Sequence, residues 1–396
     1  MTFSKNDVVI VSAKRTPIGN FGGYFKHVPT PVLGATVINA VITSPLIPLN
    51  KIDEVLMGCV LSAGLGQAPA RQAALLAHLP KDIPCTTINK MCASGMKTVA
   101  MAFDSIHAKR AEIILAGGME NMSLSPFLMP GTRFGYRMGA QIIQDHMMHD
   151  GLTDAYDQHL SMGAIAEQCA KEFHISREAQ DGFARTSLSR AIHATQSGFF
   201  KKETTAFTLE QQGEKKTLTQ DEGPLTVKPE KISQLKPVFS KDGTITAANA
   251  SSISDGAAML SVMSAAQANQ LKLTPLARII DYTTIATEPV KFPIAPISAI
   301  ETLLKKIDWK INEVDLFEIN EAFAVVVLIT MQKLSIPYEK VNIHGGACVL
   351  GHPIGASGAR ILVTLIHALQ REKKKRGIAA LCIGGGEAMA MAIEIT

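Results

Sequence analysis

The chain of 396 residues is too long for one ordinary hydrophobic core and predicts two to three domain-sized units. Apolar residues make up 46% and charged residues 19%, which excludes a disordered protein. Aromatic residues, at 5%, are too scarce for a base-stacking nucleic-acid surface, and a formal charge of +4 is compatible with a binder of small anions without requiring one.

Strand and helix patterns alternate through the first third of the chain. The expected strands are residues 7–12, 54–60 and 112–116, the last stopped by Gly117 and Gly118, and the expected helices are residues 69–77 and 94–109. This alternation predicts βαβ units in a mostly parallel sheet.

The composition of the chain changes after Gly117 and Gly118. Residues 120–248 carry many turn residues and polar segments around one amphipathic helical stretch at 164–194, which predicts an inserted, loop-rich domain. The alternation then resumes, with an expected helix at 255–270 and an expected strand at 276–286.

Two segments of the chain resemble each other. Ser94-Gly95 begins a helical pattern followed by a buried strand and a glycine turn, and Ser357-Gly358 begins the same series near the end. The matched starts and ends favour an internal duplication of one α/β half, although any two βαβ units share some likeness.

Targeting and metal signals are weak. The start of the chain lacks a basic-then-apolar signal pattern, and the apolar runs are far shorter than the roughly 20 residues needed to cross a bilayer, so a cytoplasmic protein with no membrane partner is expected. The six cysteines show no C-x-x-C pair and no secreted disulfide framework. The His146–His149 cluster has no second ligand cluster and is interpreted as a loop or interface, so no metal site is predicted.

Cys92, in the stretch INKMCASGMK, has two interpretations. A free cysteine is often a buried small hydrophobe. A thiol at the start of a helix also meets backbone N–H groups that favour its thiolate, which would suit a nucleophile.

Three later residues could share the chemistry of such a thiol. His352 lies in a glycine-rich turn before a helix, and Cys382 ends a buried strand, so a duplicated fold could bring both to a shared cleft with Cys92. A second cysteine suits a reaction that moves a proton on and off carbon, and Asn320 could support an oxyanion. The structural alternatives are a hydrogen-bonded core histidine and a turn or cap asparagine.

The chain resembles the thiolase family over essentially its whole length. The motifs that carry the resemblance are MGCVLSAGLGQAPARQA, NKMCASGMK, AGGMENMS, NASSISDGAA, NEAF, GGACVLGHPIGASGAR and CIGGGEA, in this order. The resemblance implies an α/β thiolase fold of two duplicated βαβ-rich halves packed together, with an inserted loop domain that covers coenzyme A. It implies an N-terminal half at 1–119, completed by about 249–272, a loop domain at 120–248 and a C-terminal half at 273–396.

The resemblance also implies roles for the candidate residues. Cys92 would be the acylated nucleophile, His352 would activate it and donate to the thioester oxygen, and Cys382 would be the acid and base at carbon. Asn320 would hold the water of one oxyanion hole, and the backbone N–H groups of Cys92 and Gly384 would form the other.

Coenzyme A contacts follow less directly from the family pattern. Ser251 matches a pantetheine-contacting serine, and Met162 matches a methionine that lines the acyl pocket. The chain departs from the pattern at Ser161, where biosynthetic members have histidine, and at Leu225, where many relatives have arginine. Lys228 or Lys231 could replace that arginine at the nucleotide, or be ordinary surface lysines.

The resemblance implies an acetyl-CoA C-acetyltransferase that interconverts two acetyl-CoA with acetoacetyl-CoA and CoA, as a dimer or tetramer without a further cofactor. Phe292-Pro293 favours this short-chain enzyme, whereas Ser161 favours a 3-ketoacyl-CoA thiolase of fatty-acid degradation. A non-catalytic lipid-binding relative is a third reading, disfavoured because all four catalytic side chains are present.

Overall fold

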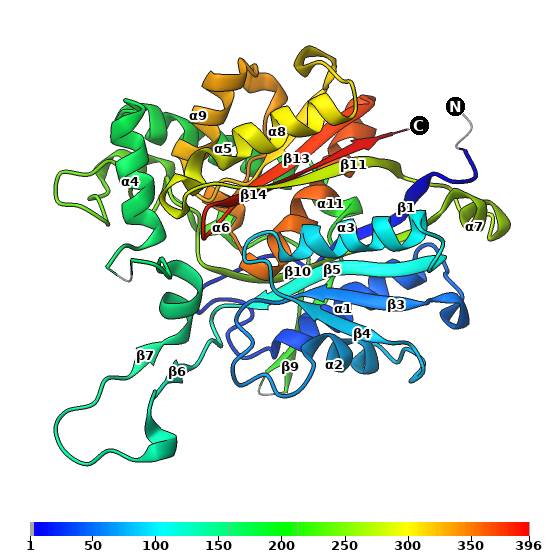
Figure 1. The fold of residues 1–396 in the computed structure, drawn as a ribbon, viewed down its shortest axis with the longest axis horizontal. Coiled ribbons are helices and arrows are strands. Elements are labelled where there is room, and N and C mark those ends of the chain that lie inside the picture. The colour runs from blue at the N-terminus through cyan, green and yellow to red at the C-terminus, as the bar shows by residue number, and fades with distance from the viewer. Residues whose placement is uncertain (1–3, 158, 212, 396) are drawn as a thin grey trace.

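A computed structural model describes residues 4–157, 159–211 and 213–395 of the chain, arranged around one large sheet (Figure 1). Its strands run in the order β12-β13-β14-β11-β1-β10-β5-β3-β4, with the short β2 paired to β10. Their bounds are β1 Val8–Arg15, β2 Gly19–Asn20, β3 Glu54–Gly58, β4 Cys85–Ile88, β5 Ile113–Asn121, β10 Ser254–Ser264, β11 Ala277–Ala286, β12 Leu316–Ile319, β13 Arg376–Ile383 and β14 Glu387–Glu394.

The sheet consists of two similar halves joined at a short seam. Strands β1 and β11 pair only through Val9 with Arg278 and Ile10 with Ala277. On one side β3 is parallel to β5, which is antiparallel to β10, and on the other β12 is parallel to β13, which is antiparallel to β14. The prediction of a mostly parallel sheet is therefore wrong, because each half also contains antiparallel strand pairs. The repeated strand order agrees with the expected duplication.

Helices cover both halves of the sheet. In the first half these are α1 Thr30–Thr43, α2 Pro69–Leu76 and α3 Ser94–His107, and in the second α8 Ala295–Lys306, α9 Ala324–Leu334, α10 Ala347–Leu350 and α11 Ile354–Glu372. The predicted helices at 69–77 and 94–109 match α2 and α3 to within two residues at each end.

Two predicted elements, a helix and a strand, need correction. The segment expected to be one helix at 255–270 forms strand β10 followed by the short helix α7 (Ala265–Gln270), because β10 lies between β1 and β5 and is buried on both faces. Strand β5 continues through Gly117 and Gly118 instead of stopping there. A Cβ on Gly118 would lie 2.0 Å from the carbonyl oxygen of Gly355, so this glycine permits a close approach of α11 to the strand.

The central helices α3 and α11 pack closely against each other at glycines near their first turns. A Cβ on Gly95 would lie 2.8 Å from the amide nitrogen of Ala359, and a Cβ on Gly358 would lie 2.4 Å from that of Met96. Only glycine allows this approach, and it brings the starts of the two helices together. The loops that precede them carry Cys92 and His352.

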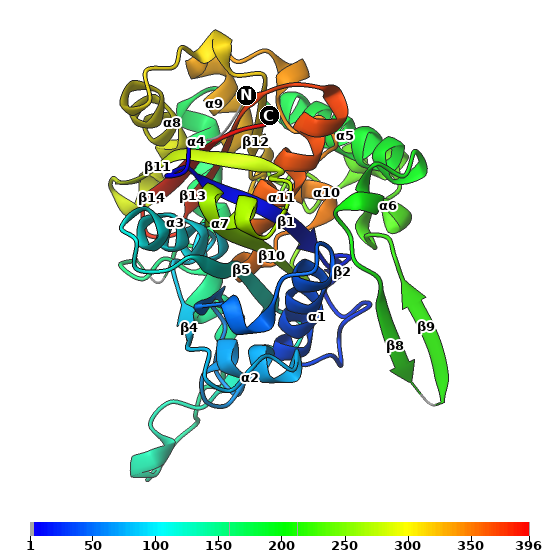
Figure 2. The same cartoon turned by 90° about the vertical axis from the view of Figure 1, so that its right-hand side faces the viewer.

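The segment between β5 and β10 covers one end of the sheet. It contains α4 Met162–Glu172, α5 Arg177–Gln196, α6 Gly223–Thr226 and the hairpin of β8 Phe207–Gln211 and β9 Glu214–Leu218, which Figure 2 shows at the side of the body. The helical stretch expected at 164–194 is two helices, because Ser176 caps the start of α5 by accepting a hydrogen bond from Ala179. The boundaries 1–119, 120–248 and 273–396 stay predictions.

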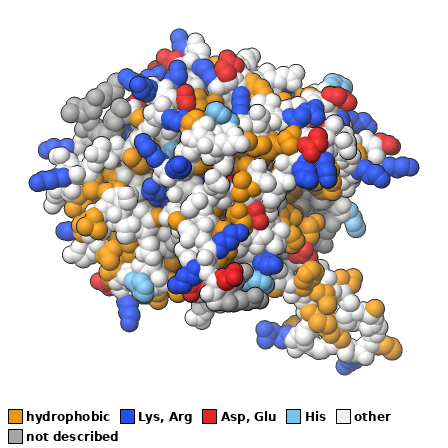
Figure 3. All heavy atoms as spheres, turned by 180° about the vertical axis from the view of Figure 1, so that it is seen from behind, with side chains coloured by type: hydrophobic (Ala, Val, Ile, Leu, Met, Phe, Trp, Pro, Cys, Tyr) orange, Lys and Arg blue, Asp and Glu red, His pale blue; other side chains and the backbone are white. Residues whose placement is uncertain are grey.

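An arm formed by residues 124–146 extends away from the body. Its strands β6 (Phe127–Leu128) and β7 (Gln144–Asp145) pair at the base, and Figure 3 shows hydrophobic side chains exposed over its surface. Phe134 and Met138 are each 92% exposed, and Ile142 is 76% exposed. Such a patch is typical of a protein–protein contact. Within the described ranges, no helix has the length and apolar character needed to cross a membrane.

Candidate active site

Cys92 lies in the tight loop between β4 and α3. Met91 adopts a left-handed conformation with φ 48°, and the hydroxyl of Ser94 accepts a hydrogen bond from the amide of Lys90 (2.9 Å) and donates one to the carbonyl oxygen of Met91 (2.7 Å). These contacts hold the loop against the first turn of the helix. Strain at a non-glycine residue beside a thiol is the kind of feature that marks a functional site.

The sulfur of Cys92 is enclosed by protein, although part of the residue is exposed. Burial raises the pKa of the thiol to about 11, and the nearby carboxyl of Glu120 adds to this. The backbone N–H of Gly384 and that of Cys92 itself oppose the rise by hydrogen bonding to the sulfur. The thiol is therefore protonated at neutral pH, with two backbone donors directed at it.

Cys382 and Gly384 come from the end of β13 and the turn into β14. Cys382 is 1% exposed, and burial together with the neighbouring charge of Cys92 raises its pKa well above the ordinary value. Lys90 forms an ion pair with Glu387, which ties the loop of Cys92 to this turn. The two cysteines and Gly384, predicted from separate motifs, thus lie together.

Asn320 and His352 form a second group. Asn320 follows β12, and its side-chain nitrogen lies 3.4 Å from Nδ1 of His352, which is itself 2.6 Å from the hydroxyl of Ser357. Burial, with a smaller contribution from Arg360, lowers the pKa of His352 to about 3, so its ring is neutral. Within the described ranges, Nε2 of His352 and Oδ1 of Asn320 have no hydrogen-bond partner.

A buried carboxylate links the two halves beside these groups. Glu120 of β5 accepts hydrogen bonds from the amides of Val60 (3.0 Å), Leu61 (3.2 Å) and Gly355 (2.9 Å). Burial raises its pKa to about 7 against the effect of these donors. Gly355 is the second residue of α11, so Glu120 holds the start of that helix against the first half.

A pocket of about 590 Å³ opens beside both groups, and its lining is mostly apolar. His352 and Met162 reach it, and a Cβ on Gly384 would lie 3.3 Å from the sulfur of Met162. Ile354 also lines it and belongs to the apolar cluster against which Cys92 packs. Ser251 lines the same pocket, as does Ser161, whose hydroxyl caps α4 by accepting a hydrogen bond from Ala164 (3.2 Å).

Further lining comes from residues that the motifs did not indicate. Val238 and Phe239 reach the pocket from the loop before Thr244, and the ring of Phe239 packs edge-on against Phe323 at 6.3 Å. The signal available in the sequence was two adjacent apolar residues in a polar segment, which is weak on its own. Both remain more than a third exposed, as expected for residues that border an opening.

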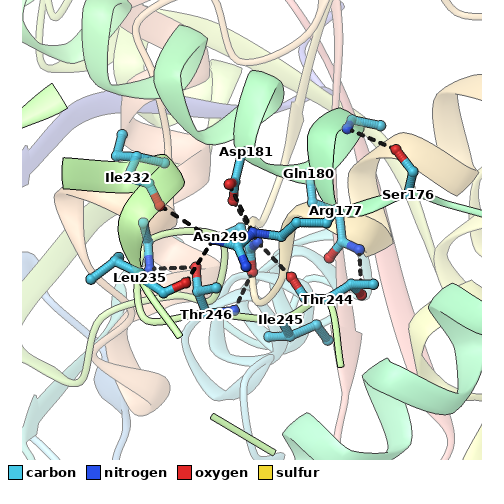
Figure 4. Close-up of polar contacts among 12 residues, drawn as sticks. Ser176, Arg177, Gln180, Asp181, Ile232, Leu235, Thr244, Ile245, Thr246 and Asn249 are labelled. Carbon is cyan, nitrogen blue, oxygen red and sulfur yellow. Dashed lines mark hydrogen bonds and ion pairs between the residues drawn. The ribbon is translucent and has the colours of Figure 1, made fainter. Parts of the chain in front are cut away.

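The loop that carries Ser251 is fixed to α5 by a polar network (Figure 4). The side-chain nitrogen of Asn249 donates to Asp181 (3.0 Å) and to the carbonyl oxygen of Thr244 (3.0 Å), and Arg177 pairs with Asp181 at 2.8 Å. Arg177 also donates to the carbonyl oxygen of Leu235 (2.8 Å). The network therefore joins both segments that flank the pocket to one helix.

A second pocket of about 200 Å³ continues from the first, since Val227, Ala247 and Ser252 line both. Lys228 and Lys231 line this smaller pocket and are exposed to solvent, whereas Leu225 is 55% exposed and lines neither pocket. The position of the two lysines suits contact with an anionic group at the pocket mouth. In the described part of the chain, no three His, Cys, Asp or Glu side chains are grouped to hold a metal ion.

Comparisons with known proteins agree with this architecture. Residues 8–266 match the thiolase N-terminal domain and residues 273–395 match the thiolase C-terminal domain. A probable acetyl-CoA acyltransferase of Staphylococcus aureus (strain COL) is 48% identical over 389 residues, which cover 98% of each chain.

Two solved structures have the same fold. The acetyl-CoA acetyltransferase of Bacillus anthracis has a TM-score of 0.96 at 38% identity, covering 98% of this chain and 99% of that one. The Acat5 thiolase of Ascaris suum, solved with coenzyme A, has a TM-score of 0.93 at 40% identity, covering 98% and 100%. With both family domains matched along almost its whole length, the chain belongs to the thiolase family of acyltransferases.

Proposed function

We propose that the protein is an acetyl-CoA C-acetyltransferase, which condenses two acetyl-CoA to acetoacetyl-CoA and CoA, or runs in reverse, through an acetyl-Cys92 intermediate. The observation that carries this proposal is the convergence on one sulfur of two backbone N–H groups, from Cys92 and Gly384, beside a second buried cysteine. Oxyanion donors next to a nucleophile and an acid–base thiol suit acyl transfer coupled to carbon deprotonation.

In the first half-reaction, Cys92 passes its proton to Nε2 of His352 and attacks the thioester carbon of acetyl-CoA. The N–H groups of Cys92 and Gly384 donate to the tetrahedral oxyanion, and one such donor is typically worth about 3–4 kcal/mol of barrier. The carbon–sulfur bond to CoA breaks, and Cys382 protonates the departing thiolate. Acetyl-Cys92, an imidazolium and the Cys382 thiolate remain.

In the second half-reaction, the Cys382 thiolate removes a methyl proton from a new acetyl-CoA. Nε2–H of His352, with a water held by Asn320, donates to the enolate oxygen. The enolate carbon attacks the acetyl carbon, the bond to Cys92 breaks, and the imidazolium returns its proton to that sulfur. The charges and protons of the resting enzyme are restored, so no further cofactor is required for the cycle.

Coenzyme A would occupy the two connected pockets. The apolar lining of the larger one, with Ser251 and Met162, suits the pantetheine arm and the acyl group. Lys228 and Lys231 in the smaller one suit the nucleotide phosphates. The Ascaris suum thiolase, a relative with the same fold, was solved in complex with coenzyme A, which supports coenzyme A as the ligand.

Chain length is the property that separates the proposal from its rival, a 3-ketoacyl-CoA thiolase of fatty-acid degradation. We expect thiolysis by the purified protein to give a kcat/KM for acetoacetyl-CoA at least about tenfold above that for a ten-carbon 3-ketoacyl-CoA, because a pocket closed near Met162 would exclude the longer acyl chain. The measurement is steady-state thiolysis of both substrates under the same conditions.

Faster or equal cleavage of the ten-carbon substrate would replace the acetyl-specific proposal by the rival. Two observations favour that rival: the name acyltransferase of the Staphylococcus aureus relative, and a pocket lining that includes the flexible side chains of Met122, Met148 and Leu152. Turnover of neither substrate would instead support a non-catalytic, lipid-binding relative.

The exposed apolar arm supports a homo-oligomer, either a dimer or a tetramer. Light scattering of the purified protein is expected to give a mass of two or four chains, and Met138→Glu with Ile142→Glu is expected to weaken the association, because charges would enter the contact. A monomeric wild-type protein would contradict a role of the arm in oligomerisation. So would a double variant that forms an oligomer of the same mass and stability as wild type. A cytoplasmic location stays a prediction.

A further inference from the structure

The hydroxyl of Ser357 makes two short contacts that bear on His352. Its oxygen lies 2.9 Å from the carbonyl oxygen of Pro353, to which it donates, and 2.6 Å from Nδ1 of His352. Ser357 is fully buried in the first turns of α11, and His352 is 6% exposed at the wall of the larger pocket. Each contact needs one donor, and the protons present on Ser357 and His352 decide which atom that is.

A carbonyl oxygen only accepts, and a serine hydroxyl has one proton. With the proton of Ser357 on the carbonyl oxygen of Pro353, none is left for the imidazole, and Nδ1 of His352 is then the donor in the second contact. We infer that Ser357 is a positioning residue that keeps the single proton of neutral His352 on Nδ1 and leaves the lone pair on Nε2. This inference rests on the base role proposed above for His352.

The tautomer matters because both partners of the first step are neutral at rest. Burial lowers the pKa of His352 to about 3 and raises that of Cys92 to about 11, so no thiolate–imidazolium pair exists before substrate binds. The proton must therefore move during attack on the thioester. Only the tautomer with a free Nε2 lone pair accepts it, because Nδ1 faces Ser357 and not the pocket.

The Nδ1–H tautomer of His352 also decides how the amide of Asn320 is oriented. Its Nδ2 atom lies 3.4 Å from Nδ1, too long for a strong hydrogen bond, and two donors would face each other there. The Nδ1–H tautomer favours the reversed amide, with the oxygen of Asn320 toward the ring. In the reversed orientation Nδ2 of Asn320 occupies the position that Oδ1 holds in the structure, where Oδ1 has no hydrogen-bond partner among the described residues. Nδ2 there can donate a hydrogen bond to the proposed water.

A corresponding serine acts in the same way in the other half of the fold. Ser94 donates to the carbonyl oxygen of Met91 and accepts from the amide of Lys90, and so holds the loop of Cys92. Each half thus uses the hydroxyl of its Ser-Gly pair, with one hydrogen bond donated and one accepted, to fix the loop that carries one of the two reacting side chains.

The kinetic test compares Ser357→Ala with Ser261→Ala. Ser261 is also fully buried, but its hydroxyl only donates to the carbonyl oxygen of Val41, far from the pocket. We expect Ser357→Ala to lower kcat for thiolysis about 10- to 100-fold with little change in KM, and Ser261→Ala to leave both unchanged. An unchanged kcat in a folded Ser357→Ala protein would overturn the inference.

A direct measurement does not depend on turnover. The ¹⁵N chemical shifts of the imidazole nitrogens in histidine-labelled wild-type protein, with His352 assigned by its loss in His352→Asn, should show Nδ1 protonated and Nε2 unprotonated. In Ser357→Ala the Nε2–H tautomer should appear. Protonation at Nε2 in the wild-type protein would refute the role of Ser357, even in an active enzyme. If the wild-type protein lacked thiolase activity, the proposed function would fail while the tautomer could still be read.

Discussion

Thiolysis of acetoacetyl-CoA is expected to fall by about 10⁴-fold or more in the Cys92→Ser variant, which removes the nucleophile but keeps its size. A serine hydroxyl is far less acidic than a thiol, so neutral His352 would ionise it much less readily. Incubation with radiolabelled acetyl-CoA should label the wild-type protein and leave the variant unlabelled. The result would identify the sulfur that carries the acetyl group.

The matched control is Cys85→Ser, which changes a half-buried thiol on β4 whose contacts are the carbonyl oxygen of Ile83 and the side chain of Arg71. Its activity should stay within about twofold of wild type, as for a surface substitution of small effect. Full retention of thiolysis by Cys92→Ser, or acetylation of the Cys92→Ser protein at another residue, would reject the nucleophile assignment.

Exchange of the methyl protons of acetyl-CoA with deuterated water is expected to slow about 10²- to 10⁴-fold in Cys382→Ala, while Cys92 still becomes acetylated. The buried thiol of Cys382 lies close enough to Cys92 for their charges to interact, which suits a base that acts on the second substrate at the acetylated site. Removing it should separate the two half-reactions. Mass spectrometry of acetyl-CoA and of the intact protein measures both.

Cys169→Ala is the control for this variant. Cys169 is a second cysteine that raises the pKa of Cys382 electrostatically, and it is 5% exposed in α4. Exchange in that protein should remain near the wild-type rate. If Cys382→Ala exchanged methyl protons as fast as wild type, another group would be the base.

Strands β1 and β11 and helices α2 and α3 were predicted close to their observed bounds, because each is an apolar or alanine-rich segment bounded by turn residues. Strand β10 was mistaken for a helix. Its alanines and methionines have high helix propensity, and a strand buried on both faces shows no alternation. The continuation of β5 through Gly117 and Gly118 was missed because glycine usually interrupts a strand. Here a side chain at Gly117 would collide with the backbone of β10, and one at Gly118 with the backbone of α11.

The residues of the candidate site were identified from motifs, but their contacts were not. In the sequence Cys92 lies 260 residues before His352 and 290 before Cys382, and local pattern without the family resemblance carries no information on which backbone donors face the thiol. The glycine crossing of α3 and α11 and the turn after β13 decide that, since they set the distances over which hydrogen bonds act.

By itself, the sequence determined the family, the duplicated α/β plan and the candidates for the reacting side chains, because these are properties of local pattern and residue type. The tertiary structure alone decided the protonation of the site: burial keeps Cys92 a thiol and His352 neutral, and the contact with Ser357 selects one tautomer. Protonation depends on desolvation and on neighbours from distant parts of the chain, which only the packed fold brings together.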